Sequence, residues 1–252
     1  MIEIHPLTGI GEVRLGDDLA GLLAGALERQ GLRPAAGDVL VVTQKIVSKA
    51  EGRLVKLSSV TPGPEALRLA ALTGKDPRLV ELVLAESDAV VRAVPNVLIT
   101  RHRLGLVMAN AGIDRSNIGE GGEDRALLLP EDPDASAARL RGALAGLLDS
   151  APAVIVSDSF GRPWRHGVVN VAIGASGVAS LVDRRGELDR DGRRLEVTQV
   201  ALADMIATAA GLATGEGAEG IPAVLVRGLP APAAPERPAA ALARPPEEDL
   251  FR

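Results

Sequence analysis

The sequence contains no cysteine and no tyrosine, and Trp164, Phe160 and Phe251 are the only aromatic residues among its 252. Without cysteine, the chain cannot form a disulfide, a thiolate zinc site, an iron–sulfur cluster or a thiol nucleophile. With so few aromatic side chains, a single-stranded nucleic-acid surface of the base-stacking kind is excluded. The core must therefore be built from alanine, valine, leucine and isoleucine, which make up most of the 46% of residues that are hydrophobic.

Basic residues and histidines are also scarce for certain functions. The 28 basic residues are outnumbered by 33 acidic ones, which gives a net charge of −5. This balance excludes the basic stripe that binding to duplex nucleic acid requires. Three histidines, His5, His102 and His166, are too few for a typical multi-histidine metal site. Any bound metal is therefore expected to be a hard cation that prefers oxygen ligands, such as Mg²⁺ or Mn²⁺.

No segment has the pattern of a signal peptide or a membrane span. The N-terminal residues MIEIHPLTGIGEVR lack a basic region followed by an apolar run. The longest uncharged run, residues 167–182, has 16 residues and three glycines, which is too short and too polar to cross a bilayer. We therefore expect a cytoplasmic protein with no membrane partner.

Hydrophobic periodicity predicts a chain in which helices and strands are mixed throughout. Amphipathic helices are expected over residues 17–31, 64–72, 136–148 and 197–212. Short apolar runs predict strands over residues 39–43, 97–100, 104–108, 153–156, 168–173 and 223–226, with the second and third of these paired. The order predicts an α/β fold, or α+β with a mixed sheet and flanking helices.

The C-terminal region differs in composition from the rest. Six of the seventeen residues from 230 to 246 are proline, and most of the others are alanine. Composition alone therefore predicts a disordered or polyproline-like tail. The ending PPEEDLFR also carries an apolar pair, Leu250 and Phe251, that is able to dock on the body of the protein or on a partner.

Two predicted strands are followed by carboxylates with hydroxyl or amide side chains beside them. Asp114 lies in LGLVMANAGIDRSN with Ser116 and Asn117, and Asp158 lies in AVIVSDSFGR with Ser159. Ligands gather beyond the carboxyl ends of strands in open α/β sheets, where two aspartates can hold a divalent cation that bridges phosphate oxygens. The alternative is that each aspartate only closes an Asx turn or caps a helix.

GEGAEG matches the spacing GxGxxG through Gly215, Gly217 and Gly220. A dinucleotide fingerprint needs a strand before it and a helix after it, whereas the predicted order here is helix, loop, strand. That order excludes the fingerprint. Two interpretations stay open: a loop whose backbone amides hold a phosphate, or an ordinary connection between a helix and a strand.

Two groups of basic residues lie near these motifs. In TQKIVSKAEGR, Lys45 and Lys49 are four residues apart, so a helix would direct both the same way, either toward phosphates or toward solvent. In GRPWRHG, Arg162, Arg165 and His166 follow the second aspartate motif. This cluster favours an anionic ligand, and a structural salt-bridge cluster is the competing interpretation.

Four long motifs resemble, in order, those of the coenzyme F420-0:L-glutamate ligases. They are GDVLVVTQKIVSKAEGR, the stretch from ESDAVVR to LGLVMANAGIDRSNIG, VIVSDSFGRPWRHG and GEGAEGIPAVLVRG. The resemblance extends from about residue 5 to residue 228, and PPEEDLFR is similar to the family's tail. It implies a catalytic unit of one or two lobes over residues 1–228, a Pro/Ala-rich segment over 229–246 and a C-terminal motif over 247–252.

The resemblance implies a GTP-dependent amide ligase. The lactyl carboxylate of F420-0 would be activated by the γ-phosphate as an acyl phosphate, which the amine of L-glutamate attacks; some members add further γ-linked glutamates. It also implies Mg²⁺ or Mn²⁺, K⁺, and an intertwined homodimer with an unusual mixed α/β fold. Two alternatives stay open: a ligase that joins glutamate to another carboxylate acceptor, and a non-catalytic nucleotide-binding regulator.

The same resemblance assigns site residues. Asp114 and Asp158 match a first metal site, Ser159 and Glu216 match a second, and Asp114, Asp158 and Glu216 form the catalytic set. Nucleotide contacts match Ile10, Gly11, Glu12, Val13, Gln44, Lys49, Asn117, Thr214, Gly215, Glu216, Gly217, Ala218, Glu219, Gly220 and Ile221. Gln44 stands where related sequences often carry serine or threonine. The sequence identifies no base for the amine beyond His166 as a candidate.

Overall fold

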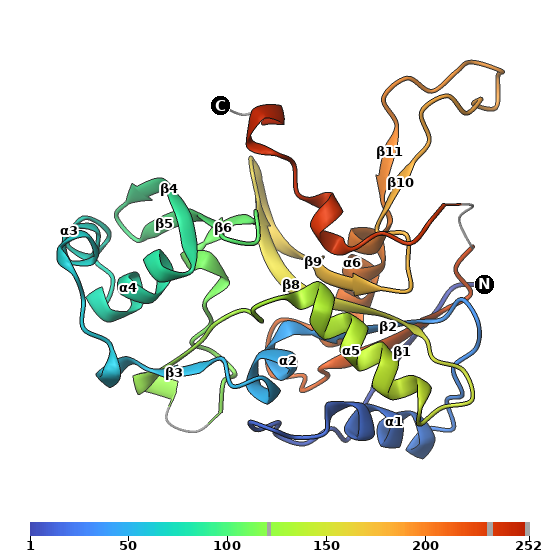
Figure 1. Ribbon diagram of the computed structural model, residues 1–252, viewed down its shortest axis with the longest axis horizontal. Helices are drawn as coiled ribbons and strands as arrows, with labels where there is room; N and C mark the ends of the chain where they lie inside the picture. The colour runs from blue at the N-terminus through green and yellow to red at the C-terminus, as the bar shows by residue number, and fades with distance from the viewer. Residues whose placement is uncertain (120–121, 231–233, 250–252) are drawn as a thin grey trace.

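A mixed five-stranded sheet forms the centre of the computed structural model, which describes residues 1–119, 122–230 and 234–249. In spatial order the strands are β1 (Glu3–Leu7), β12 (Ala223–Arg227), β2 (Val39–Thr43), β8 (Ala153–Arg162) and β9 (Arg165–Ser176). Strands β2 and β8 are parallel, and the other neighbours are antiparallel (Figure 1). The mixed sheet with flanking helices is therefore confirmed.

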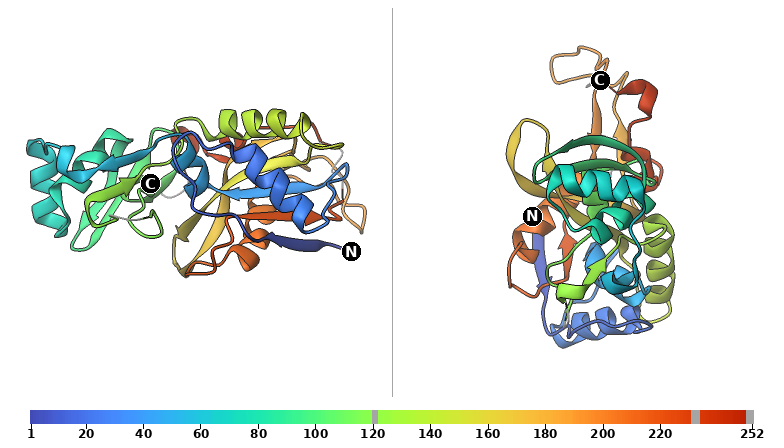
Figure 2. Two further views of the ribbon diagram at one scale, coloured as in Figure 1. Left: turned by 90° about the horizontal axis from the view of Figure 1, so that it is seen from below. Right: turned by 90° about the vertical axis from the view of Figure 1, so that its left-hand side faces the viewer.

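Helices cover both faces of this sheet. Helix α6 (Leu202–Thr214) packs on one face, and α1 (Leu19–Arg29), α2 (Gln44–Ala50) and α5 (Pro133–Ala145) lie on the other (Figure 2). Alternate residues of β2 point to opposite faces, so Leu40 and Val42 join one core cluster while Val39 and Val41 join the other. Helix α6 meets the sheet through small side chains, the buried Ala203, Ala207 and Ala210. These small side chains let the helix lie close to the sheet, so this part of the core is packed without large aromatic rings.

A smaller lobe lies away from the central sheet, at the left of Figure 1. It consists of α3 (Pro64–Thr73), α4 (Pro77–Ala85) and the antiparallel sheet of β4 (Ser87–Val94), β5 (Val97–His102) and β6 (Val107–Ala109). It has its own core, with Leu69, Val80 and Leu98 buried together. The predicted pairing of residues 97–100 with residues 104–108 is confirmed as β5 with β6.

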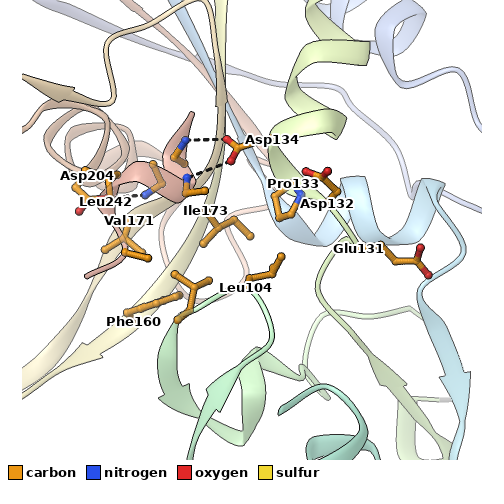
Figure 3. A pocket seen from close by; sticks show the side chains of 15 residues that line it. Leu104, Glu131, Asp132, Pro133, Asp134, Phe160, Val171, Ile173, Asp204 and Leu242 are labelled. Carbon is orange, nitrogen blue, oxygen red and sulfur yellow. Dashed lines mark hydrogen bonds between the residues drawn. The ribbon is translucent and has the colours of Figure 1, made fainter. Parts of the chain in front are cut away.

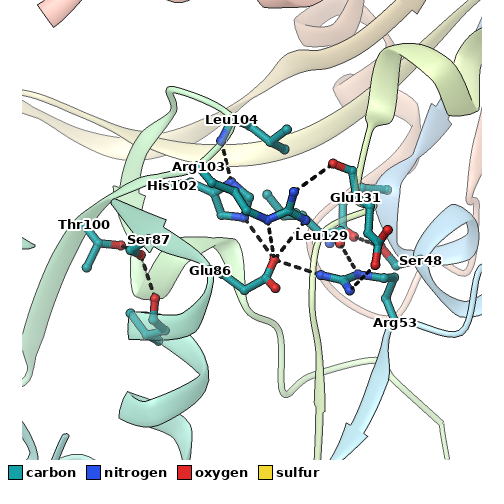
Figure 4. Close-up of polar contacts among 12 residues, drawn as sticks. Ser48, Arg53, Glu86, Ser87, Thr100, His102, Arg103, Leu104, Leu129 and Glu131 are labelled. Atoms are coloured by element: carbon teal, nitrogen blue, oxygen red, sulfur yellow. Dashed lines mark hydrogen bonds and ion pairs between the residues drawn. The ribbon is translucent and has the colours of Figure 1, made fainter. Parts of the chain in front are cut away.

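The two lobes are connected by a short sheet and a buried ionic network. Strand β3 (Leu54–Lys56) pairs with β7 (Arg125–Leu127) between them. Beside this sheet, the carboxylate of Glu86 receives Arg53 Nη2 at 2.8 Å and lies 3.4 Å from both His102 Nε2 and Arg103 Nη2 (Figure 4). Glu86 is the C-cap residue of α4 and Arg53 follows α2, so this network joins an element of each lobe.

Several predicted boundaries shift for local reasons. The helix expected over 136–148 begins earlier, at Pro133, because Asp132 caps it by accepting a hydrogen bond from the Ala135 N–H at 2.9 Å. The helix expected over 197–212 begins at Leu202. The residues before it form β11 (Gln199–Ala201), which pairs with β10 (Leu181–Asp183) in a projecting hairpin. Among the described residues, no helix is long and apolar enough to cross a membrane.

The C-terminal segment departs from the prediction made from its composition. Residues 234–249 contain two short 3₁₀ helices, Ala239–Leu242 and Pro246–Glu248. The Asp134 carboxylate, at the start of α5, accepts hydrogen bonds from the backbone N–H groups of Ala239 and Ala240. This charged acceptor fixes a segment that its proline content alone predicts to be loose. Leu250 and Phe251 lie outside the described residues.

Candidate functional site

A cavity of about 640 Å³ opens where the parallel pairing of β2 with β8 ends. Five separate stretches of sequence surround it: the loop before α1, the end of β2 with the start of α2, the segment after β6, β8 at Ser159, and the loop between α6 and β12. All but three of the residues assigned by resemblance line it: Ile10, Gly11, Glu12, Val13, Lys49, Asp114, Asn117, Ser159, Thr214, Gly215, Glu216, Gly217, Ala218, Gly220 and Ile221. The three outside this lining are Gln44, Asp158 and Glu219.

The parallel pair positions the second aspartate motif. Thr43 at the end of β2 is opposite Ser157 on β8, and Asp158 is the next residue. The sequence predicted that this strand ends at residue 156. Strand β8 instead continues to Arg162 and forms an antiparallel ribbon with β9. The sheet nevertheless narrows at Asp158 because β2 stops, so Asp158 and Ser159 lie at the carboxyl edge of the parallel pair.

Asp114 faces this edge from the other side. Its backbone forms an isolated β-bridge with Leu127. Its carboxylate accepts a hydrogen bond from Gln44 Nε2 at 2.7 Å and forms an ion pair with Lys45. It is therefore held by side chains of α2, not by an Asx turn or a helix cap. Gln44 is itself 1% exposed and accepts from Ser48 Oγ at 2.9 Å, so it lies beneath the carboxylates.

The two aspartates repel each other electrostatically. Burial, and then the charge of Asp114, raises the pKa of Asp158 to about 7. A carboxyl group that is half protonated near neutral pH next to a second carboxylate is stabilised in its charged form by a cation. The oxygen donors present, from Asp114, Asp158, Ser159 and Glu216, are the ones that Mg²⁺ and Mn²⁺ prefer.

As the side chains stand, the predicted ligands do not all converge. Across the described ranges, no three Asp, Glu or His side chains are grouped closely enough to hold a metal. Asp114 and Asp158 form the close pair, while Glu216 Oε1 accepts a hydrogen bond from Asn170 Nδ2 at 3.0 Å. The donor chemistry therefore fits a hard cation at the aspartate pair, with Glu216 as a separate arm of the same cavity.

Lys49 is a buried cation at the cavity wall. It is 8% exposed, and its Nζ donates to Glu12 Oε1 at 2.6 Å and to the Asn117 carbonyl at 3.1 Å. Residues Gln44–Ala50 form a helix, so Lys45 and Lys49 project the same way, as their spacing predicts. The interpretation of these lysines as a solvated surface does not hold for Lys49.

The glycine loop follows a helix and precedes a strand, which confirms the order that excludes a dinucleotide fingerprint. Gly215 has φ +66°, and a Cβ at that position would lie 2.2 Å from Cδ of Glu219. Glu219 folds back to accept from the Gly217 N–H at 2.8 Å, and Asn117 Nδ2 donates to the Gly217 carbonyl at 3.0 Å. Only glycine fits at 215, and Glu219 shapes the loop from within.

One polar atom at this cavity lacks a partner. Thr214 is 7% exposed and lines the cavity, and its Oγ1 is buried without a hydrogen bond in the part of the chain that the structure describes. A buried hydroxyl without a partner costs free energy. A ligand in the cavity with an exposed acceptor or donor would remove that cost.

A second cavity, of about 360 Å³, lies between β9, the start of α5 and the C-terminal segment (Figure 3). Its walls are apolar, with Phe160, Val171 and Ile173 among them, and its charged lining groups are all carboxylates: Glu131, Asp132, Asp134 and Asp204. This negative lining disfavours phosphate or carboxylate ligands. The first cavity, with Lys45 and Lys49, is the better site for an anion.

The basic cluster of GRPWRHG forms the tip of the β8–β9 hairpin. Arg165 and His166 are exposed, and Arg162 Nη2 donates to the His166 carbonyl at 3.0 Å. In the described part of the chain no carboxylate pairs with Arg162 or Arg165, so the salt-bridge interpretation finds no support. His166 does not line the cavity of about 640 Å³.

Some residues of the site were not assigned from the sequence. Thr43, Lys45, Ile46, Ser116, Gly119 and Pro222 also line the cavity. The lysine spacing and the DRSN motif drew attention to Lys45 and Ser116 without giving them a role. Asn170 lies in the unremarkable strand RHGVVNVAIG, and no sequence pattern distinguishes it.

Comparison with known proteins gives one consistent result. A family model described as F420-0:Gamma-glutamyl ligase matches residues 9–228. A protein of Methanopyrus kandleri named "Coenzyme F420:L-glutamate ligase" is 48% identical, with 100% of this chain and 98% of its own length covered. Proteins of the same name from Methanothermobacter thermautotrophicus and Archaeoglobus fulgidus are 44% and 43% identical, over 100% of this chain and 99% and 96% of theirs.

Proposed function

The chain belongs to the F420-0:gamma-glutamyl ligase family, and on that premise we propose that it joins L-glutamate to the carboxylate of coenzyme F420-0 at the expense of GTP. The product is an amide, and any further γ-linked glutamates would be added by the same chemistry. The proposed cofactors are Mg²⁺ or Mn²⁺ together with K⁺. The reaction serves coenzyme F420 biosynthesis.

The observation that carries this proposal is the convergence of the assigned residues on one cavity. Carboxylates from two distant segments, Asp114 and Asp158, lie close together, and two lysines of α2 stand beside them. Within the described residues, the buried Thr214 hydroxyl forms no hydrogen bond, so it is free to bind a polar group of the ligand. A cavity that combines carboxylates, lysines and a glycine loop suits a nucleoside triphosphate bound together with a cation.

The proposed reaction has two steps. A carboxylate oxygen of F420-0 attacks the γ-phosphorus of GTP, the bond to the β-phosphate oxygen breaks, and GDP leaves. The glutamate nitrogen then attacks the acyl carbon, phosphate leaves with the bridging oxygen, and the amine loses a proton. Such chemistry needs positioning and charge neutralisation more than a protein nucleophile, so the absence of cysteine is no obstacle.

This chain's own residues supply the positioning. A bound divalent cation would neutralise phosphate charge during the transfer. Asp114, Asp158, Ser159 and Glu216 would hold the cations. Lys49 is fixed by Glu12 and the Asn117 carbonyl, so its charge is presented at a defined place in the cavity wall. The N–H groups of Gly215 and Gly217 already donate to the Gly211 carbonyl and to Glu219, so the remaining backbone amides of the loop at 215–220 would donate to phosphate oxygens.

Two alternative functions can be tested against the proposed one. The first is a ligase that uses another carboxylate acceptor, and the second is a regulator that binds a nucleotide without turning it over. The retained acidic pair favours catalysis, because binding alone does not require both carboxylates. Product analysis by mass spectrometry, after incubation with F420-0, L-glutamate, GTP and Mn²⁺, distinguishes the proposed function from both alternatives: only the proposed function gives F420-0 that carries a glutamyl residue.

We also propose a homodimer, with the outer face of α6 as part of the interface. Leu212 is 84% exposed and Met205 is 60% exposed on this face, and the β10–β11 hairpin projects beside it. Exposed apolar side chains grouped beside a projecting ribbon are typical of a surface that a second copy covers.

Replacing Leu212 with aspartate is expected to convert this dimer to a monomer, because a charge would have to be buried at the interface. Light scattering at micromolar concentration measures the mass. Leu72→Asp, on the exposed face of α3 in the small lobe, is the matched control and is expected to remain dimeric. A fully active monomeric parent protein, or a dimeric Leu212→Asp variant, would contradict the proposal.

A further inference from the structure

Glu216 stands between two glycines on the loop beside the cavity, so its backbone does little to fix the direction of its carboxylate. Among the residues that the structure describes, that carboxylate has one hydrogen-bond partner. Asn170 Nδ2 donates to Glu216 Oε1 at 3.0 Å. Asn170 is 9% exposed, whereas Glu216 is an exposed residue. A buried amide therefore holds an otherwise free loop side chain.

Asn170 is itself fixed on both sides. It lies on β9 opposite Ser159 of β8, in the ribbon that follows Asp158. Its carbonyl accepts a hydrogen bond from Thr208 Oγ1 of α6 at 2.7 Å. The amide thus lies between the strand that carries one set of proposed cation ligands and the helix that leads to Glu216.

Gly211 provides the space for this amide. It lies inside α6, where a Cβ would be 2.5 Å from Asn170 Nδ2 and 3.1 Å from its Cγ. The first distance is shorter than side-chain contacts allow, so any larger residue would displace the amide. Glycine is an unfavourable residue in the interior of a helix. Its presence here is explained by the side chain that packs against it.

We propose that Asn170 is a positioning residue that aims the Glu216 carboxylate at a cation in the cavity, and that Gly211 is required for it to do so. The inference rests on the proposed function, in which Glu216 is a cation ligand. A neutral amide that donates to one oxygen leaves the negative charge intact and the second oxygen free. Groups that orient ligands in this way commonly contribute 10–100-fold to metal affinity.

The test measures Mn²⁺ binding to the GDP complex by electron paramagnetic resonance titration. Asn170→Ala removes the donor, and Gly211→Ala displaces it. Each is expected to weaken Mn²⁺ binding about 10–100-fold and to leave GDP binding in the presence of chelator unchanged. In the Glu216→Gln background neither substitution is expected to cause a further loss, because the ligand that they orient is already gone.

Gly142→Ala is the matched control. Gly142 lies inside α5, and a Cβ there meets nothing within 4 Å, so this variant is expected to bind Mn²⁺ like the parent protein. If the parent binds Mn²⁺ and both test variants bind it equally well, the positioning role is wrong while the proposed function stands. Losses that persist unchanged in the Glu216→Gln background would also overturn it. If the parent–GDP complex binds no Mn²⁺, the cation site of the proposed function fails first, and the inference with it.

Discussion

Replacing Asp158 with asparagine is expected to lower turnover at least about 100-fold, equivalent to about 2.7 kcal/mol of activation free energy. Asparagine keeps the size of the side chain but removes a charge from the carboxylate pair that the proposed reaction uses to hold a cation. Asp158 lies at the edge where β2 stops, close enough to Asp114 for its pKa to be raised to about 7 by burial and by that neighbour. GTP consumption with F420-0 and L-glutamate present measures the effect.

Asp204→Asn is the control for this substitution. Asp204 is also a partly buried carboxyl group with a raised pKa, caused by burial, and its Oδ1 accepts a hydrogen bond from the Ala172 N–H at 2.9 Å. It lines the other cavity, and asparagine can still accept that hydrogen bond. We expect near-normal turnover for Asp204→Asn. Near-normal turnover for Asp158→Asn would remove Asp158 from the proposed machinery.

The second large effect concerns stability. Glu86→Gln is expected to lower the free energy of unfolding at pH 7 by about 3 kcal/mol. Burial alone would raise the pKa of Glu86, but His102, Arg53 and Arg103 outweigh it and lower that pKa from 4.5 to about 2. Removing the carboxylate leaves Arg53 without its closest carboxylate partner at the junction of the two lobes. Urea unfolding measures the difference.

The pH dependence gives this prediction its sign. Since the pKa of Glu86 is lower in the folded protein, its contribution is complete above about pH 4.5 and is lost as the pH falls through about 2. The difference between parent and variant is therefore expected to shrink as the pH is lowered from 5 toward 2. Glu131→Gln is the control: Glu131 is 74% exposed at the other side of Arg53, and its loss is expected to cost less than about 1 kcal/mol. Equal losses for the two variants would contradict this account.

The sequence predicted four of the five strands of the central sheet, all but β1, because their signals are local. Strands such as Val39–Thr43 and Ala223–Arg227 are apolar runs bounded by turns, and their predicted limits hold to within a residue. The β10–β11 hairpin was missed because its strands have three residues each and are held by pairing with each other, which no periodicity records. The C-terminal segment was mispredicted because its partner, Asp134, is about a hundred residues away.

The site residues also fall into two groups: those that local sequence motifs predict and those that are placed by contacts between distant segments. Asp114, Asp158 and the glycine loop belong to motifs with recognisable chemistry. Asp114 and the loop line one cavity, and Asp158 lies beside Asp114. The resemblance listed Gln44 with the nucleotide contacts, whereas the structure buries it beneath Asp114. Asn170 was unpredictable for a physical reason. Its importance depends on a contact between β9 and a loop 46 residues later in the chain, which requires a glycine in a third element.

The most direct test of the proposed reaction follows one oxygen atom. F420-0 with ¹⁸O at both oxygens of its lactyl carboxylate is incubated with the protein, L-glutamate, GTP and Mn²⁺, and the product and the released phosphate are analysed by mass spectrometry. The proposed reaction predicts F420-0 extended by a glutamyl residue, and one heavy oxygen in the phosphate released with the first glutamate. A singly glutamylated product accompanied only by unlabelled phosphate, or GTP hydrolysis without a glutamylated product, would contradict it.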